Sequence, residues 1–364
     1  MKLAWKELVY NRKKYLLIEI VVVLLMFMVL FLSGLASGLG RAVSSGIDNI
    51  SAEYFLISDT AENLITVSSL DETVYEQVME MTDGNAAVLD IQRMYLMKDG
   101  DEEKLDITYF AITPDSFLQP KVQEGNEFVA ATGVENPIIL DSDFRAEGIR
   151  VGDTVRDSST KMEFMVVGFA EDQMYGHTSV GFITTDSYTR LRKELNPFYD
   201  QSYHAFVIPA EYAGKMKIEG TELVPKTDII NSLPGYTAEQ TTIQMIIWVL
   251  VIASAAIIGI FYYIITLQRE KQFGVMKAIG LGMKKLSGMI CSQVCMVAGL
   301  GAVIANILAF GMSAAMPQTM PFYLSVSYAC IVTIAFILIS LAGSLLSIRK
   351  IARVDPIKSI GGAE

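Results

Sequence analysis

The sequence has little cysteine and little histidine. Its three cysteines, Cys291, Cys295 and Cys330, all lie within long apolar segments, and its two histidines are His177 and His204. The charged middle of the chain therefore has no disulfide and depends on a hydrophobic core, which about 200 residues can supply. The spacing of Cys291 and Cys295 allows a soft metal site, but small packing residues in a helix interface are the favoured interpretation. Two histidines poorly supply a metal site or a catalytic triad, so we expect no intrinsic metal and no catalytic residues.

The motifs of common enzymes are also missing. The chain has no Gly-x-x-x-x-Gly-Lys-Ser/Thr loop with which to bind a nucleotide phosphate. It has no Gly-x-Ser-x-Gly, His-Glu-x-x-His or Cys-x-x-Cys motif either. We therefore expect a protein that does not act as an enzyme on its own.

Four long apolar segments stand out, in a one-plus-three arrangement around a single acidic region. They cover residues 15–35, 243–267, 286–312 and 328–348. Each has the roughly 20 residues that a helix needs to cross a ~30 Å hydrocarbon layer. A cleaved signal peptide is an alternative for the first segment, but its apolar run exceeds the usual 7–15 residues, so an uncleaved anchor is favoured.

Charge predicts the orientation. Residues 41–240 hold 35 of the 40 acidic but only 15 of the 29 basic residues, whereas basic residues flank the apolar segments before residue 15, between 269 and 285, and after 348. The positive-inside rule places both termini and the loop 269–285 in the cytoplasm. The acidic domain and the loop 313–327 are then outside, and so acidic a domain should not bind nucleic acid.

The acidic region is typical of an α+β domain inserted between the first two membrane helices. Strand patterns recur at 87–97, 105–112, 136–140, 161–168, 179–184 and 204–208, and the stretch 150–155 predicts a strand entered by a Gly-Asp turn. Helical patterns appear at 70–81, with Ser68 or Ser69 as the cap, and at 185–195. The resulting layout is a cytoplasmic segment 1–14, helix 15–40, domain 41–240, helix 241–268, cytoplasmic loop 269–285, helix 286–312, outer loop 313–327, helix 328–348 and cytoplasmic tail 349–364.

Two features of the first helix allow specific expectations. Glu19 is the one acid within a predicted span, about one turn from the cytoplasmic edge, and is expected to reach Lys13, Lys14 or bulk water, with contact to a partner helix as the alternative. Gly34 and Gly38 form a GxxxG pattern, which indicates close helix approach, either in a dimer or within the chain.

The cytoplasmic loop carries a short amphipathic helix. Residues 268–282 continue the second span, and Gly274, Gly280 and Gly282 are expected to break it. An apolar stripe opposite a lysine is typical of a helix that docks in a partner's groove, and a basic connector lying on anionic lipid is the alternative. The expected coupling residues are Phe273, Gly274, Val275, Met276, Lys277, Ala278, Ile279 and Gly280.

These residues resemble a known family. The segment 272–282 is similar to the coupling helix of the FtsX/MacB-like permeases, the type VII ABC transporters. Gly152-Asp153, the strand 164–168 and the C-terminal 354–361 are similar to that family's outer domain and end signature. Further matches resemble the family's HrtB-type haem exporter permeases of Gram-positive bacteria: residues 1–4, 32–35, 38–40, 172–179, 320–324 and 360–364. The stretch 52–123 carries the least resemblance.

The resemblance implies a permease in the bacterial plasma membrane that forms a homodimer surrounded by lipid. Two copies of a separate ABC ATPase would bind beneath it and hold the ATP. Movement would pass through the helices to the outer domains, with haem as the exported substrate and no permanently bound cofactor. An FtsX-like signal relay, or export of a peptide, lipid or antibiotic, is the alternative.

Candidate haem ligands lie around one loop and at the end of the domain. Haem iron accepts Tyr, His or Met as axial ligands. Met174, Tyr175 and His177 lie between two strand patterns, and Tyr236 directly precedes the second span. The alternatives are an interfacial tyrosine for Tyr236 and a structural or solvated histidine for His177.

Overall fold

A computed structural model of the chain describes residues 10, 12–98, 100, 103–131, 133–316, 320–344 and 348–349. The predicted N-terminal segment 1–14 and C-terminal tail 349–364 lie largely outside the described residues, as does the signature 354–361. The chain divides into two compact units. One combines Met1–Gly38 with Gln240–Glu364 and is called the membrane unit here; the other, Leu39–Glu239, is called the inserted domain.

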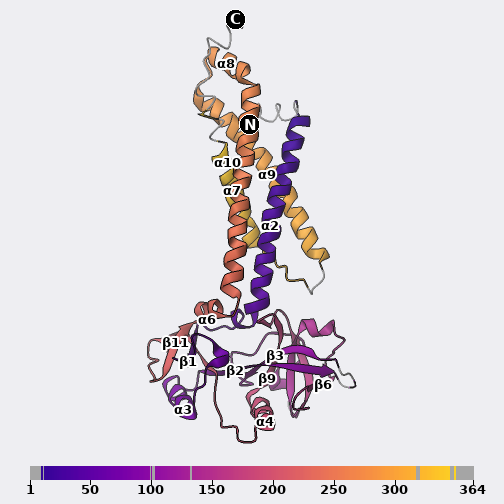
Figure 1. Cartoon of the computed structure of the whole chain (residues 1–364), viewed down its shortest axis with the longest axis vertical. Helices are drawn as coiled ribbons and strands as arrows, with labels where there is room; N and C mark the ends of the chain where they lie inside the picture. The colour runs from indigo at the N-terminus through magenta and orange to yellow at the C-terminus, as the bar shows by residue number, and fades with distance from the viewer. Residues whose placement is uncertain are drawn as a thin grey trace. The chain divides into compact units, whose positions relative to one another are not determined.

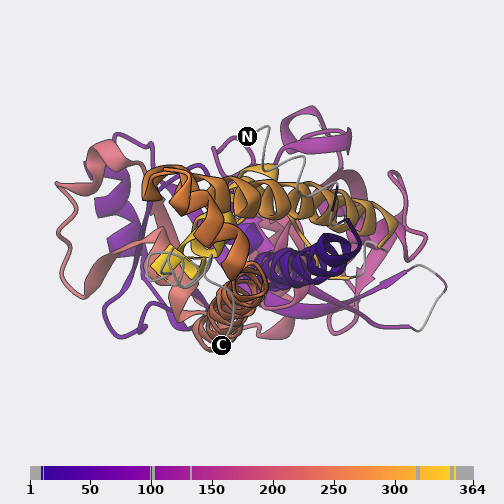
Figure 2. The same cartoon turned by 90° about the horizontal axis from the view of Figure 1, so that it is seen from above.

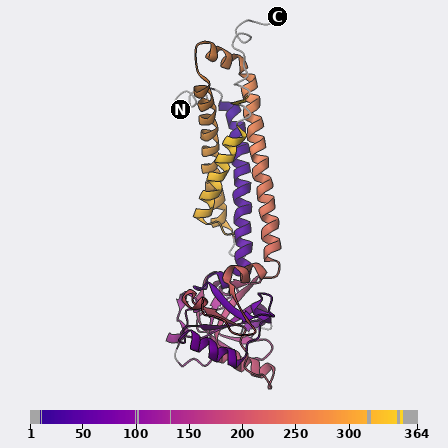
Figure 3. The ribbon, with the colours of Figure 1, turned by 90° about the vertical axis from the view of Figure 1, so that its left-hand side faces the viewer.

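The membrane unit is a bundle of long apolar helices (Figures 1 and 3). Within the described residues, four helices are long and apolar enough to cross a membrane. Buried residues from all four form one hydrophobic cluster, and Figure 2 shows the bundle from above. The long helices are α2 (Arg12–Asp48), α7 (Tyr236–Gln268), α9 (Met283–Ala315) and α10 (Val326–Gly343), and the short α8 (Glu270–Ala278) joins α7 to α9.

Glycine permits the closest approach in this unit. A Cβ built on Gly38 would lie 2.2 Å from the carbonyl oxygen of Pro321, and one on Gly34 would lie 2.4 Å from Cζ of Phe322. The amide of Tyr323 donates a hydrogen bond to the carbonyl oxygen of Gly34 (3.0 Å). The GxxxG pattern of α2 therefore makes an intrachain contact, which was one of the two alternatives.

The inserted domain is built on one mixed sheet of eleven described strands in the order β11-β1-β10-β2-β3-β9-β5-β7-β4, with β6 pairing β2 and β7, and β8 pairing β9. Most pairs are antiparallel, but β3–β9 and β5–β7 are parallel. The strands are β1 (Tyr54–Ser58), β2 (Ala87–Lys98), β3 (Leu105–Ile112), β4 (Val122–Gly125), β5 (Pro137–Asp141), β6 (Thr154–Asp157), β7 (Glu163–Ala170), β8 (Met174–Tyr175), β9 (Thr178–Thr184), β10 (Ala205–Ile208) and β11 (Thr221–Pro225).

Short helices complete the domain. Its described α-helices are α3 (Glu72–Met81), α4 (Thr185–Leu195), α5 (Ala210–Ala213) and α6 (Lys226–Ser232), with 3₁₀ turns at Ile65–Val67, Phe128–Ala130 and Ser142–Arg145. A main cluster of buried residues from β1, β2, β3, β9 and β10 includes Ile47 from the end of α2. The α+β fold inserted between the first two long helices is the fold that the sequence predicts.

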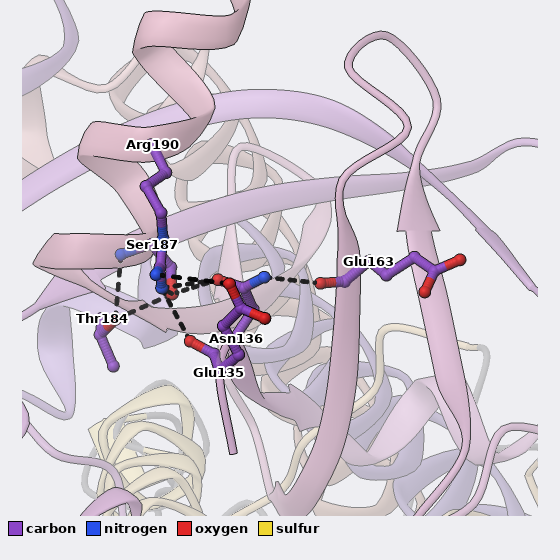
Figure 4. A network of polar contacts seen from close by, with 6 residues as sticks. All are labelled: Glu135, Asn136, Glu163, Thr184, Ser187 and Arg190. Atoms are coloured by element: carbon purple, nitrogen blue, oxygen red, sulfur yellow. Dashed lines mark hydrogen bonds and ion pairs between the residues drawn. The ribbon is translucent and has the colours of Figure 1, made fainter. Parts of the chain in front are cut away.

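A polar network fastens α4 to the sheet (Figure 4). Thr184 caps the helix by accepting a hydrogen bond from the amide of Ser187 (3.1 Å). The Ser187 hydroxyl and the Arg190 guanidinium both donate to Oδ1 of Asn136 (3.3 and 2.7 Å), and Asn136 donates to the carbonyl oxygen of Glu163 (3.0 Å). Because these bonds join α4 to the starts of β5 and β7, they serve the fold rather than a site.

Most of the predicted strands and helices are confirmed within one or two residues. The Gly-Asp turn before β6 is confirmed by the positive φ of Gly152 (92°). The predicted cap of α3 is wrong, because Asp71, not Ser68 or Ser69, accepts the amide of Val74. The sequence patterns missed β1, β11 and α6, whose apolar stretches are short.

The expected break at Gly274 is also wrong. Gly274 is buried inside α8, and α7 ends instead at Gln268, before a non-helical Arg269. A helix tolerates an interior glycine at a cost of about 1 kcal/mol, which packing can offset. Gly280, with a φ of 91°, follows the end of α8 as expected.

Candidate functional site

The candidate site is centred on the hairpin between β8 and β9. Its two turn residues, Gly176 and His177, both have positive φ (55° and 63°), which is the backbone of a type I′ turn. Asp172, just before β8, also has a positive φ (60°). A histidine held in this region is uncommon, because its Cβ crowds the backbone, so surrounding contacts must hold it there.

The end of α2 supplies such contacts. The amides of Gly176 and His177 donate to the carbonyl oxygens of Val43 and Ala42, both at 2.9 Å. The amide of Met174 donates to the hydroxyl of Ser45 (3.0 Å). Three backbone donors of the hairpin are therefore satisfied by α2, all of them within the inserted domain.

Side chains strengthen the contact. Arg41 forms an ion pair with Asp172, and both side chains are about one-third exposed. The side-chain amide of Asn49 donates to the carbonyl oxygen of Asp172 (2.7 Å). Gly46 lies so close that an added Cβ would be 3.0 Å from the carbonyl oxygen of Met174. The hairpin is thus bound along about two turns of α2.

The same hairpin reaches the first turn of α7. Nε2 of His177 lies 3.6 Å from Oε1 of Glu239. Tyr175 and Tyr236 pack against the same buried cluster, which includes Phe110 and Ile47. The hairpin therefore contacts both long helices where they enter the inserted domain. We call this group the helix joint; it comprises residues 41–49, 171–177 and 236–239.

The buried carboxyl group of Asp141 also stabilises the helix joint. Asp141, 1% exposed at the end of β5, accepts the amides of Asp143 (2.9 Å) and Gln173 (2.6 Å). Burial raises the pKa of Asp141 to about 7, although these two bonds act in the opposite direction. Asp141 thereby fixes the residue next to Asp172.

The structure brings all four candidate ligands into the joint, but with different availability. The Tyr175 ring packs edge-on to the Phe110 ring, with the ring centres 5.5 Å apart. Burial raises the pKa of Tyr175 to about 12, although a hydrogen bond with Thr66 acts in the opposite direction. The Met174 sulfur accepts the hydroxyl of Ser179 (3.3 Å). His177 is half exposed, and Tyr236 is partly buried. His177 therefore has the most exposed side chain of the four, because Met174, Tyr175 and Tyr236 are each partly buried.

A cavity of about 720 Å³ adjoins the joint but lacks ligands for iron. Five of the described residues that line it belong to the joint, and none of the lining residues is a Tyr, His, Met or Cys; the five are Gly46, Asn49, Glu171, Asp172 and Gln173. Its charged side chains are mostly acidic, with one lysine, Lys121. Nor do the described residues include a cluster of three His, Cys, Asp or Glu suited to a metal ion. His204, the other histidine, accepts the amide of Ile91 (3.0 Å) within the sheet, and burial lowers its pKa to about 4.

The expected coupling segment forms α8 as a helix with one covered and one open side. Phe273 is 3% exposed and packs with the membrane unit's cluster, against which Met276 also packs. Val275 and Ile279, one turn apart, are 46% and 71% exposed. Two exposed apolar side chains on one helix face are typical of a protein contact.

Comparison with known proteins gives a consistent assignment. Residues 244–356 match the profile of the FtsX-like permease C-terminal family. HrtB of Staphylococcus haemolyticus, whose name assigns it provisionally to hemin transport as a permease, is 30% identical over 370 residues, covering 100% of both chains. HrtB of Staphylococcus epidermidis, named in the same way, is 28% identical over 365 residues, again 100% of both.

More distant similarities reach other transporters. An uncharacterized ABC transporter permease of Mycobacterium bovis is 24% identical over 360 residues, covering 96% of this chain and 97% of the relative. The solved extracellular domain of the transporter YknZ from Gram-positive bacteria aligns with 48% of this chain and 98% of its own, at 16% identity and a TM-score of 0.33. The YknZ likeness is too weak to support an inference.

Proposed function

The chain belongs to the FtsX-like permeases of ABC transporters, and from this premise we propose that it is the membrane subunit of an ATP-driven haem exporter. The observation that carries the proposal is similarity along the whole length to two permeases named for hemin transport. A match over 100% of both chains includes the inserted domain, where substrate selection is expected, as well as the shared permease region. The protein then lies in a bacterial plasma membrane with both termini in the cytoplasm and residues 41–240 outside.

The ATPase partner would bind at α8. An ABC permease requires an ABC ATPase, and α8 offers Val275 and Ile279 as exposed apolar contacts with Lys277 on the same helix. Phe273, buried against the membrane unit, would keep α8 fixed relative to the helices it must move. We propose a homodimer of permeases with two ATPase copies.

The helix joint would carry the movement into the inserted domain. α2 and α7 are continuous helices that enter the domain, and the hairpin 171–177 contacts the ends of both. A displacement of either helix would therefore act on β8 and β9, and through β9 on the centre of the sheet. In this mechanism ATP drives conformational change and the chain supplies no catalytic residue.

Haem would bind at the helix joint, with His177 as the first candidate for an axial ligand. Its imidazole is half exposed, and Glu239 lies close enough to orient it. Tyr175, Tyr236 and Met174 would form the apolar and polar surroundings of the ring. Tyr175 would become a ligand only after losing a proton that burial makes it hold.

A haem titration of the purified permease–ATPase complex tests both the proposed export of haem and the proposed binding site. We expect haem to stimulate ATP hydrolysis, and the Soret band to shift on binding. His177→Ala and Tyr236→Phe should weaken binding several-fold, whereas Tyr95→Phe, at an exposed tyrosine on β2, should not. Unchanged spectra in His177→Ala, Tyr175→Phe and Tyr236→Phe would exclude this site but not export. ATP hydrolysis indifferent to haem would contradict the exporter and favour a signal relay or another substrate.

A further inference from the structure

Three oxygens inside the membrane unit are buried and have no hydrogen-bond partner among the described residues. Tyr15 and Tyr262 are 6% and 2% exposed, and their hydroxyl oxygens accept or donate no hydrogen bond among the described residues. Oε1 of Glu19 is likewise buried and unpartnered within that part of the chain. This oxygen of Glu19 therefore does not reach bulk water, whereas Glu19 as a whole is partly exposed, and the expected reach of its carboxyl group toward water stays a prediction.

These groups belong to one place. Tyr15 and Glu19 lie one turn apart on α2, and Tyr262 of α7 interacts electrostatically with both and with Cys295 of α9. Gly301 of α9 leaves the room for the carboxyl group, because an added Cβ would lie 3.2 Å from Oε1 of Glu19. Three helices thus enclose the site.

An unpaired carboxylate is costly in such surroundings. The helices present apolar side chains around it, and Glu19 forms no ion pair with any described residue. Tyr262 interacts with Tyr15, Glu19 and Cys295, and none of these groups supplies a positive charge. Binding a proton removes the charge, and hydrogen bonds to water satisfy the remaining lone pairs.

We propose that Tyr15, Glu19 and Tyr262 form a proton-binding site within the membrane unit, completed by water held between their oxygens. Glu19 takes one proton from water and becomes a neutral carboxylic acid, and its release returns that proton to water. A buried water molecule usually makes about three hydrogen bonds, so one water could serve all three groups. On this proposal the packing of α2 against α7 and α9 belongs to the proton-bound form, and proton release loosens α2, the helix that also enters the helix joint.

Infrared difference spectroscopy of the full-length protein in lipid nanodiscs, recorded between acidic and alkaline pH, tests this site. We expect a C=O band of a protonated carboxyl group that disappears in Glu19→Gln. Tyr15→Phe and Tyr262→Phe keep Glu19 but alter its hydrogen bonding, so they should shift the band. Ser33→Ala is the matched control, because Ser33 carries another buried, unpartnered hydroxyl of α2.

The outcomes separate clearly. A pH-difference spectrum identical in wild type and Glu19→Gln would overturn the proposal, because Glu19 would then bind no proton in this range. A Glu19 band that neither tyrosine variant shifts would also overturn it. If Glu19→Gln does not fold, the two tyrosine variants decide alone, with Ser33→Ala expected to leave the band in place.

Discussion

At the scale of single residues, the inserted domain depends on a buried acid that the sequence gives little reason to notice. Asp141 directly follows the apolar run Ile138-Ile139-Leu140, so its position at a strand end was visible. Its two backbone partners were not, because Gln173 lies 32 residues further along the chain. One carboxyl thereby positions the segment that pairs with Arg41.

The first prediction concerns the pH dependence of this acid. Burial raises the folded-state pKa of Asp141 from 3.8 to about 7, so the folded domain binds the proton more tightly than the unfolded chain. The stabilisation is complete below pH ~4 and is lost as pH rises through about 7. We expect the wild-type free energy of unfolding to fall by roughly 2–4 kcal/mol more than that of Asp141→Asn over this interval. Chemical denaturation at several pH values measures this difference. If the free energy of unfolding changed equally with pH in the wild type and in Asp141→Asn, the prediction would be refuted.

The second prediction concerns Gly38. An added methyl group would collide with the Pro321 carbonyl, a backbone atom that cannot move aside as a flexible side chain can. We expect Gly38→Ala to lower the free energy of unfolding in detergent by about 1–3 kcal/mol, as overpacking does. The melting temperature should fall accordingly. Gly311→Ala is the control, because nothing lies within 4 Å of its added Cβ and it occupies the same kind of helix. Similar melting temperatures for the two variants would show that α2 does not need this contact.

At the scale of elements, the sequence predicts the strands and long helices well because their signals are local. Apolar length predicts α2, α7, α9 and α10, and alternation predicts β2 and β3. The helix joint was predicted only in part. Tyr175 and His177 were candidates, but the pairing of Arg41 with Asp172 spans 131 residues, and a domain so rich in acids offers Arg41 many equivalent partners. Only the folded chain selects one of them.

The third prediction tests α8 as a docking element. Val275→Asp and Ile279→Asp place a charge on its exposed apolar face, which should cost most of the affinity for the ATPase because a buried unpaired charge is unfavourable. Gln272→Asp adds the same charge to the same helix, where the side chain bonds to Arg269, and should retain binding. Co-purification of the ATPase from membranes gives the readout. Equal recovery with all three variants would place the ATPase contact elsewhere.

The fourth prediction tests the helix joint as a transmitter. Arg41→Gln and Asp172→Asn remove a partly exposed ion pair, so the loss in stability should be about 1 kcal/mol or less. Haem export should nevertheless fall several-fold while ATP hydrolysis continues, because α2 would move without displacing the hairpin. Asp106→Asn removes the exposed ion pair with Arg93 on β2 and β3, and serves as the matched control. If haem export fell as far in Asp106→Asn as in Arg41→Gln and Asp172→Asn, the helix joint would have no specific role in transmission.

At the scale of the whole molecule, the described residues include four helices long and apolar enough to cross a membrane, an inserted domain and the short helix α8. The sequence has no phosphate-binding loop. The role of an ABC transporter permease, the family to which the chain belongs, implies an ABC ATPase as partner. The sequence predicted this role because the family motifs are local. The residues proposed to bind haem come from distant segments of the chain, which is why residue patterns alone left haem and other cargoes open.

Haem export by this protein is tested most directly by the haem content of cells that lack it, grown with added haem. Haem export predicts that these cells accumulate several-fold more haem than the wild type and stop growing, and that a plasmid copy restores both. A copy carrying Val275→Asp and Ile279→Asp should restore neither. Equal haem content and equal growth in the deletion strain and the wild type would contradict the account.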